Sequence, residues 1–500
     1  MKTKLLLLLL LANFSINAQY TKIPDTNFER KLINLGIDSG PLDGQVLNSR
    51  INTITSLDVS SSTIFNLKGI EGFVSLQTLN CNTNRLTTLD VSQNTALTTL
   101  NCNSNYITTL DFSKNLSITD LTCGINDLTS LDISKNLNLK SLDCGYNELT
   151  SLDVSQNIAL TDLKCGVNKL ITLDISKNLD LKSLECRYNQ FIGLDVSHNT
   201  ALTVLICGDN LLASLDLSKN LALTNLICWN NNLTSLDLSK NLALTSLNCN
   251  FNPLTNLDVS HNINLTYLDC HSDQLTNLDV SKNTALTYLY CHTNQLTSLD
   301  ISKNTALTGL YCEYNQLTTL DPSKNIVLKG LTCYNNQLTT LDVSNNKALT
   351  YLVCSANKLQ SLNLKNGKNT SFNYFSIGFT RNPDLSCITV DDAAYSASNW
   401  GAAKDATATY QTNCSTLGTG DAVFEKIALY PNPVKGELHI DNINLEKANV
   451  YNQFGQLVKS FSLDLNNTNN TIDLSGLAKG IYFVYLINKD SVSVKKVIVV

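Results

Sequence analysis

Cysteine recurs in this chain with a fixed period, and that period restricts the possible folds more than any other feature. Fourteen of the sixteen cysteines are spaced 21 residues apart, at Cys81, Cys102, Cys123, Cys144, Cys165, Cys186, Cys207, Cys228, Cys249, Cys270, Cys291, Cys312, Cys333 and Cys354. A period of roughly 20–50 residues over many units is typical of a solenoid, in which each unit stacks only on its neighbours. The chain is therefore predicted to be a coiled array.

Each unit contains two similar halves, as the segment from Leu86 to Asn105 shows. Both halves follow the pattern Leu-x-x-Leu-x-(Val or Cys)-x-x-Asn. Apolar residues at alternate positions predict short strands that turn one side inward, with the cysteine in the core. An asparagine after each strand can pair with buried turn backbone, because its amide both donates and accepts. We expect two short parallel strands per coil, and equal spacing on both sides predicts a straight, flat rod.

This pattern resembles the leucine-rich repeats, and in particular a bacterial subclass with a nested 21-residue unit. The likeness covers residues 54–365. It implies a mainly β fold with parallel, in-register strands. Because leucine-rich repeats usually bind other molecules, it also favours a binding protein over an enzyme.

The first residues carry lysines, then a run of leucines and then small residues, which is typical of a secretory signal peptide. We assign it to residues 1–18. Open solenoid ends expose apolar core and strand edges, so both ends need caps. Residues 19–53 are predicted to form the first cap, with a helix that carries Phe28, Leu32 and Leu35 on one face.

The array is followed by a second cap, a linker and a further domain. The period fails after the array, and residues 366–414 contain the last two cysteines, Cys387 and Cys414, which are expected to form a disulfide. Residues 415–422 are small and polar, as in a linker. Six short alternating segments in residues 423–500 predict a small β-sandwich.

Four motifs in this last domain resemble the C-terminal sorting domains of the type IX secretion system of Bacteroidetes. They are Leu429–Pro433 (LYPNP), Val450–Val458 (VYNQFGQLV), Leu477–Phe483 (LAKGIYF) and Lys495–Val497 (KKV). The resemblance implies that the secretion machinery is a partner of residues 423–500. It also implies passage across the outer membrane, removal of the domain, and release or attachment at the cell surface.

Charge and hydropathy exclude two other classes of partner. The formal net charge is -6 and the basic residues are dispersed, so no basic stripe could neutralise nucleic-acid phosphates. After the leader, no stretch approaches the roughly 20 apolar residues of a transmembrane helix. We expect a monomer.

One outward column of the repeat is aspartate in nearly every coil, at Asp90, Asp111, Asp132, Asp153, Asp174, Asp195, Asp216, Asp237, Asp258, Asp279, Asp300, Asp321 and Asp342. Like charges about 4.8 Å apart repel by nearly 1 kcal/mol even in bulk water. Hydrogen bonds from neighbouring Ser and Thr and nearby lysines are expected to offset this repulsion. A row of weak calcium sites is the alternative.

The opposite face varies between repeats and becomes aromatic toward the C-terminal half. The candidate ligand-binding residues are Trp229, Tyr267, Tyr288, Tyr290, Tyr311, Tyr314, Tyr334, Tyr351, His271 and His292. Rigid, amphipathic aromatic rings are typical of recognition surfaces. The alternative to a binding role is that tyrosine occurs there because it is favourable in strands.

Two further features arise within this region. His271, His292 and Glu313 share one column on consecutive coils, which raises the hypothesis of a metal site although nothing indicates a converging geometry. Asp273 replaces a turn asparagine and lacks its donors. No nucleophile with a base and an orienting group can be assembled, so we assign no catalytic residue and no cofactor.

The sequence therefore predicts a secreted or cell-surface scaffold that binds or adheres to a protein or glycan. A structural surface spacer without a specific ligand is the alternative. A metal-dependent enzyme is less favoured.

Overall fold

The computed structural model describes most of the chain as two compact units, Met1–Tyr410 and Gln411–Val500. The described residues are 19–372, 374–414, 427–488 and 491–500. The predicted signal peptide at 1–18 and the predicted linker at 415–422 lie outside these ranges.

The coils of the first unit carry a single parallel sheet of sixteen short strands on one side. Neighbouring strands pair in register, so that Leu100 lies beside Leu121. The strands, in chain order, are β3 (Ser56–Asp58), β4 (Thr78–Asn80), β5 (Thr99–Asn101), β6 (Asp120–Thr122), β7 (Ser141–Asp143), β8 (Asp162–Lys164), β9 (Ser183–Glu185), β10 (Val204–Ile206), β11 (Asn225–Ile227), β12 (Ser246–Asn248), β13 (Tyr267–Asp269), β14 (Tyr288–Tyr290), β15 (Gly309–Tyr311), β16 (Gly330–Thr332), β18 (Tyr351–Val353) and β20 (Ile377–Gly378). The predicted mainly β, parallel-stranded solenoid is confirmed.

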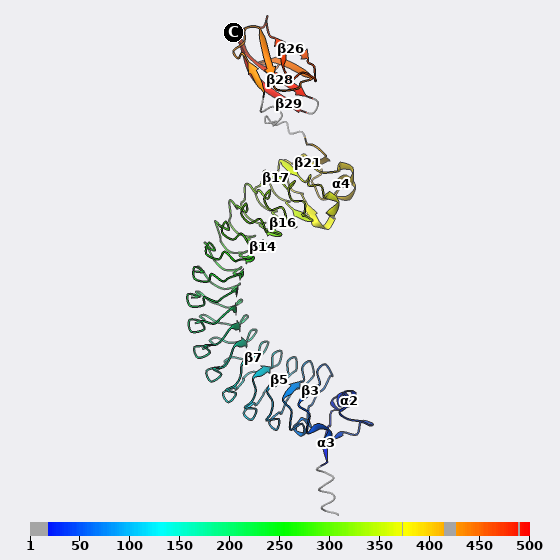
Figure 1. Cartoon of the computed structure of the whole chain (residues 1–500), viewed down its shortest axis with the longest axis vertical. Helices are drawn as coiled ribbons and strands as arrows, with labels where there is room; N and C mark the ends of the chain where they lie inside the picture. Colours follow the sequence, from blue (N-terminus) through cyan, green and yellow to red (C-terminus); the bar gives the residue numbers. More distant parts are fainter. Residues whose placement is uncertain (1–18, 373, 415–426, 489–490) are drawn as a thin grey trace, which may run out of the picture. The chain divides into compact units, whose positions relative to one another are not determined.

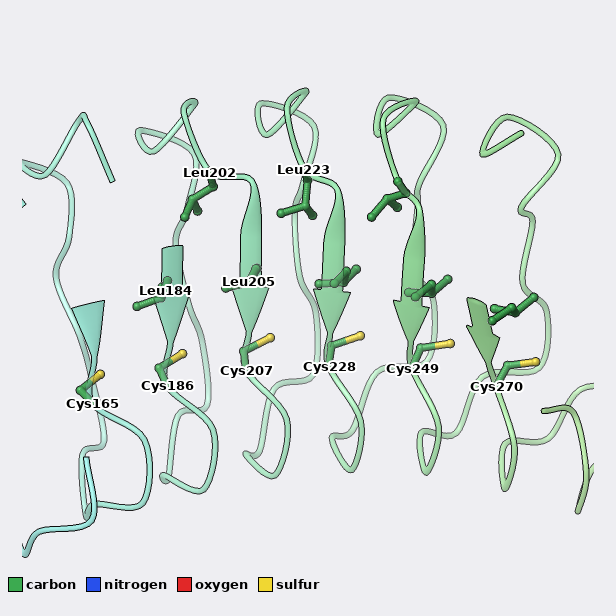
Figure 2. Close-up of a cluster of buried hydrophobic side chains, with 14 of the residues drawn as sticks. Cys165, Leu184, Cys186, Leu202, Leu205, Cys207, Leu223, Cys228, Cys249 and Cys270 are labelled. Carbon is green, nitrogen blue, oxygen red and sulfur yellow. The ribbon is translucent and has the colours of Figure 1, made fainter. Parts of the chain in front are cut away.

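One continuous apolar core runs through the coils. In every strand of this sheet from β4 to β18, the central leucine and the cysteine that follows the strand are buried, as Leu205 and Cys207 show. In Figure 2 the cysteines of successive coils form a row just past the ends of the strands, with their sulfur atoms pointing the same way. All fourteen thiols of the row are free. Burial raises the pKa of the Cys102 thiol to about 12, so these side chains pack as small apolar groups.

The prediction of two strands in every coil is wrong for most of the array. Strands occur on the second side only near its C-terminal end, in a four-stranded sheet of β17 (Thr340–Asp342), β19 (Ser361–Asn363), β21 (Cys387–Thr389) and β22 (Thr409–Gln411). Elsewhere the Leu-Asp-Val segments keep the alternation of buried and exposed side chains but form no backbone ladder with the next coil. In these segments the aspartate closes a local turn, as Asp90 Oδ1 does by accepting from the Ser92 N–H at 2.9 Å.

This one-sided ladder also overturns the expected straight rod. The coils of the first unit follow an arc with the strands on its inner side (Figure 1). Hydrogen bonds hold neighbouring strands about 4.8 Å apart. The second side has no comparable restraint over most of its length, so the coils can separate further there.

Two asparagine columns satisfy the buried turn backbone, as the sequence predicted. Asn105 Nδ2 donates to the carbonyl oxygens of Cys81 and Cys102 at 3.1 and 3.0 Å, and its Oδ1 accepts from Leu86 N at 3.0 Å. The second column, represented by Asn115, donates to two carbonyl oxygens of the preceding coil. The first column therefore connects adjacent coils and closes its own turn, whereas the second column connects adjacent coils and leaves its Oδ1 atoms buried without a partner among the described residues.

The N-terminal cap contains β1 (Tyr20–Lys22), α2 (Thr26–Asn34), β2 (Gln45–Leu47) and α3 (Asn48–Ile51). Helix α2 begins after Asp25, whose side chain accepts from two backbone N–H groups of the first turn. Phe28 and Leu32 enter the core as predicted. Leu35 does not, because it terminates the helix and remains 45% exposed.

At the other end, β20, β21 and β22 continue the stacking beyond the regular repeats, and α4 (Ala393–Asn399) lies between β21 and β22. Short 3₁₀ turns occur at η1 (Ile70–Gly72), η2 (Asn369–Ser371) and η3 (Tyr374–Ser376). Cys387 and Cys414 are disulfide-bonded.

The second unit consists of two antiparallel sheets around a core of its own. One sheet contains β23 (Ala428–Tyr430), β24 (Glu437–Asp441) and β27 (Asn470–Asp473), and the other contains β25 (Lys447–Asn452), β26 (Leu457–Ser462), β28 (Gly480–Asn488) and β29 (Ser491–Val499). Leu438 from the first sheet and Val484 from the second share the buried cluster. The small β domain is confirmed, with β27 as a strand that the sequence pattern missed.

Asp273 interrupts the first asparagine column in a way that its chemistry explains. Its Oδ1 accepts from Asn252 N at 2.7 Å, but Oδ2 is buried without a partner among the described residues. Burial raises the pKa of this carboxyl to about 8. The native state therefore keeps a proton on Asp273 at pH values where the unfolded chain has lost it.

We expect Asp273→Asn to raise the melting temperature, because the amide can donate to two cysteine carbonyls as Asn294 does in the next coil. The gain should be about 2 kcal/mol near neutral pH, the scale for satisfying a buried polar group. Between pH 4 and 8 the native carboxyl binds more protons than the unfolded one, so wild-type stability falls with rising pH. The difference in melting temperature should therefore widen through that window and level off above it.

Thermal unfolding of both proteins from pH 4 to 9 measures this effect. The matched control, Asn294→Asp, introduces the same defect one coil later and should lower the melting temperature. A lower melting temperature for Asp273→Asn would show that Asp273 has a stabilising role in its ionised form.

The aspartate column yields a second prediction. Hydrogen bonds from the backbone and hydroxyl of Ser92 lower the pKa of Asp90, and neighbouring Asp111 opposes them less strongly. Because the carboxylates already accept these bonds, we expect the melting temperature to be the same in EDTA and in millimolar calcium. A rise of several degrees with calcium would restore the hypothesis of weak calcium sites.

Candidate ligand-binding face

Each coil presents four outward positions on its strand side, and together they form the surface called here the strand face. Two are the first and third strand residues, such as Tyr288 and Tyr290, which flank the buried Leu289 in β14. The other two directly follow the cysteine, such as His292 and Thr293. Because the strands pair in register, equivalent residues of successive coils lie side by side in rows.

Four tyrosines on β13, β14 and β15 form the tyrosine cluster, which comprises Tyr267, Tyr288, Tyr290 and Tyr311. The rings of Tyr290 and Tyr311 are stacked, with centroids 4.4 Å apart and planes 3° apart. The ring centroids of Tyr267 and Tyr288 lie 5.6 and 6.4 Å from that of Tyr290. Burial raises the pKa of Tyr290 to about 12, so its hydroxyl stays neutral and can both donate and accept.

A glycine makes this arrangement possible. A Cβ atom on Gly309 would lie 2.7 Å from Tyr288 Cδ1 and 3.0 Å from Tyr311 Cε2. Such contacts are too close for a side chain, so the absence of one lets both rings close over the backbone. Tyr288 nevertheless remains 41% exposed. The cluster therefore offers ring surface to solvent while its members hold one another in place.

The two histidines belong to a separate polar cluster beside the tyrosines. Asp269 Oδ1 lies 2.6 Å from His271 Nδ1, and Asn250 Nδ2 donates to Asp269 Oδ2 at 2.8 Å. The rings of His271 and His292 stack with centroids 4.1 Å apart. Burial and the neighbouring His271 lower the pKa of His292 to about 4. His292 is therefore neutral at physiological pH.

This geometry gives the metal hypothesis no support. Glu313 is hydrogen-bonded by the hydroxyl of Thr332, and burial raises its pKa. The stacked rings of His271 and His292 face one another rather than a common point. Within the described residues, no three His, Cys, Asp or Glu side chains are grouped so that they could hold a metal ion.

Trp229 lies away from the tyrosine cluster and is positioned by its own glycine. A Cβ atom on Gly208 would lie 2.6 Å from Trp229 Nε1, so the indole rests directly against the backbone of the preceding coil. The ring of Tyr188 meets it edge-on, with centroids 5.3 Å apart.

A hollow of about 400 Å³ lies between Trp229 and the polar cluster. Its lining consists of Trp229, Asn230, Asn248, Asn250, Phe251 and His271. Sequence reasoning found only Trp229 and His271 as candidate binding residues. Phe251 occupies the same repeat position as Tyr314, three coils later, so the period alone could have revealed it. The need for glycine at 208 and 309 depends on ring orientation, which the sequence does not show.

The candidate residues thus fall into separate groups rather than one site. Tyr314 and Tyr334 form an edge-to-face pair at 5.0 Å. The tyrosine and polar clusters adjoin, because the hydroxyl of Tyr267 lies 3.5 Å from Asp269 Oδ2. Trp229 is connected to them through the hollow.

Solved structures of other proteins share the fold of the solenoid. The functional domain of InlJ from Listeria monocytogenes, described as including a cysteine ladder, is 29% identical with a TM-score of 0.66, over 96% of this chain and 99% of that chain. An internalin, inlF, from the same organism is 25% identical with a TM-score of 0.57, over 61% and 94%. A leucine-rich-repeat protein of Leptospira interrogans, 24% identical with a TM-score of 0.58 over 69% and 91%, shows the fold alone. No curated protein matches the chain by sequence.

Residues 428–500 match a family described as the secretion system C-terminal sorting domain. A domain of this kind directs its chain to the type IX secretion machinery, so the protein is secreted or attached at the cell surface. Among the described helices, none has both the length and the apolar character to cross a membrane. The chain therefore combines a solenoid that has the fold of leucine-rich-repeat proteins with a C-terminal sorting domain of the secretion system at residues 428–500.

Proposed function

We propose that this protein is an exported binding scaffold whose strand face recognises an extracellular protein or glycan. The observation that carries the proposal is the tyrosine cluster, in which stacked rings remain accessible on a surface that otherwise changes from coil to coil. Large aromatic side chains are enriched at the centres of recognition surfaces.

The physical advantage of the cluster is that its rings are ordered before a ligand arrives. Tyr290 and Tyr311 are already stacked in the free protein, so binding would immobilise few additional torsions. Neutral hydroxyls at the ring edges add hydrogen-bonding capacity without the desolvation cost of a charge. A partner can therefore bury aromatic area at a small entropic cost.

The contrast between the two sides of each coil also supports recognition. The second side of the coils, opposite the strand face, repeats one arrangement: an aspartate accepts from a serine N–H in coil after coil. On the strand face the third strand position is asparagine, lysine, glutamate or tyrosine in different coils, as at Asn101, Lys164, Glu185 and Tyr290. A spacer without a ligand needs the repeated aspartate turns, but it gives no reason for the residues of the strand face to vary between coils.

Binding agrees with the chemistry of the polar cluster better than catalysis does. Asp269 orients His271 in the manner of a base and its partner, but a nucleophile would have to be within hydrogen-bond reach of the imidazole. The nearest aromatic neighbours of His271 are the rings of Phe251 and His292. We therefore assign His271 a role in the binding surface.

Export is assigned to the sorting domain and recognition to the solenoid. We propose that residues 423–500 are removed after passage across the outer membrane, which leaves the solenoid released or attached at the surface. Mass spectrometry of the mature C-terminus in culture medium and washed cells tests this division.

We expect the double substitution Tyr290→Ala/Tyr311→Ala to weaken binding at least tenfold, because it removes the stacked pair at the centre of the cluster. The measurement screens the full chain on arrays of glycans and extracellular proteins, then determines the affinity of wild type and variant for the ligand found. The matched control is Asn101→Ala/Thr122→Ala, which changes the same strand position nine coils earlier.

Unchanged affinity of the tyrosine variant for that ligand would contradict the proposal. Equal, unspecific binding by wild type and both variants would favour the spacer. Thermal melting of each variant, followed by circular dichroism, shows whether a loss of binding comes from the altered surface or from unfolding of the solenoid.

A further inference from the structure

We propose that the hollow between Trp229 and Phe251 is a binding subsite for one neutral sugar ring of a glycan. This inference rests on the proposed binding function and names the chemistry of its ligand. A volume of about 400 Å³ falls within the range of roughly 300–1,000 Å³ typical of small-molecule sites. Two aromatic rings and three amides in its lining define what can occupy it.

The rings of Trp229 and Phe251 present flat apolar surfaces to the hollow, and neighbouring groups hold them in place. Trp229 lies against Gly208, where no side chain intervenes. Phe251 adopts a left-handed backbone with φ of 53° and is 53% exposed. The same left-handed turn recurs at this position in the other coils, so it belongs to the repeat. The ring of Phe251 is only partly covered by His271, which meets it edge-on at 5.0 Å. A sugar ring presents C–H groups on its faces, and these groups pack on aromatic rings.

Three asparagines of the lining have unused side-chain atoms that match hydroxyl groups. Asn230 Nδ2 donates to Asp209 Oδ2 at 3.0 Å, and Asn250 Nδ2 donates to Asp269 Oδ2 at 2.8 Å. Asn248 Oδ1 accepts from Asn250 N at 3.3 Å. These bonds fix all three amides. Within the described chain, Asn230 Oδ1, Asn250 Oδ1 and Asn248 Nδ2 have no hydrogen-bond partner, so two acceptors and one amide donor remain for a ligand.

The charge of the hollow selects a neutral ligand. None of its six lining residues is lysine or arginine, so a phosphate or sulfate group would find no counter-charge. Asp269, which lies behind the lining, is already hydrogen-bonded by Asn250 and His271, so it does not demand a cation. An apolar peptide side chain would bury the three amides without partners, which is unfavourable. Sugar hydroxyls both donate and accept and therefore satisfy all three.

The chain contains a built-in reporter for this subsite. Only two tryptophans are present, Trp229 and Trp400. Trp400 is fully buried in the C-terminal cap of the solenoid, whereas Trp229 lines the hollow. A change in tryptophan fluorescence that saturates with added ligand will therefore come from Trp229.

The test titrates the full chain with neutral oligosaccharides of hexoses and N-acetylhexosamines while tryptophan fluorescence is recorded. Inorganic phosphate and an uncharged tripeptide serve as comparators. We expect a saturable change with at least one oligosaccharide and none with either comparator. Phe251→Ala and Asn248→Ala should each raise the dissociation constant for that oligosaccharide at least tenfold.

The matched control is Tyr146→Ala. Tyr146 occupies the same repeat position as Phe251 five coils earlier, with φ of 54° and 50% exposure, so its removal perturbs the backbone equally without touching the hollow. Its dissociation constant should equal that of the wild type. Equal binding by Phe251→Ala and Asn248→Ala, or no response to any oligosaccharide, would overturn the assignment, and a response to the tripeptide alone would replace the sugar with a peptide.

These outcomes are distinguishable from failure of the proposed function. The arrays can reveal a ligand whose binding depends on Tyr290 and Tyr311 while no oligosaccharide changes the tryptophan fluorescence. In that case the scaffold binds a ligand, but the assignment of the sugar subsite is wrong. If neither the tyrosine cluster nor the hollow responds, both proposals fail.

Discussion

Backbone hydrogen bonds between equivalent strand positions are the interaction on which the rest of the solenoid depends. Cys102 N donates to the carbonyl oxygen of Thr122 at 2.8 Å, and the same bond recurs from coil to coil. A single coil buries too few side chains to offset the entropy of ordering its residues, so stacking is the condition for folding. Because the ladder occupies one side over most of the array, it also sets the curvature and holds the outward residues of that side in parallel rows.

The period predicted the fold, the core and the role of the asparagines, because those features depend on which residues recur. It did not predict the one-sided ladder. An extended Leu-Asp-Val segment alternates inward and outward in the same way whether or not its backbone pairs with a neighbour. The serine two residues after each aspartate predicts a local turn bond such as Asp90 with Ser92, but it does not tell the two cases apart, since Asp342 makes the same bond with Ser344 in the paired strand β17.

The sequence predicted on which face of the solenoid the candidate residues lie, but not which of their side chains contact one another. Counting repeat positions places Tyr290 and Tyr311 in one row, and the structure stacks them. How rings tilt across rows depends on which neighbours lack a side chain, and Gly208 and Gly309 decide this for Trp229 and Tyr288. Asp273 shows the same limit, since its lost donors were evident from the pattern whereas its bond to Asn252 N was not.

The row of buried thiols determines whether the protein can refold after it unfolds in an oxidising environment. Thiol–disulfide exchange requires a thiolate, and burial keeps thiols such as Cys102 protonated well above physiological pH. Fourteen free cysteines therefore remain inert outside the cell while the coils stay stacked. Once the stack opens, closely spaced sulfhydryls become reactive together and can cross-link in many combinations. Denaturation in air should accordingly be a one-way event, and the working lifetime of the protein is governed by the rate of unfolding rather than by its equilibrium.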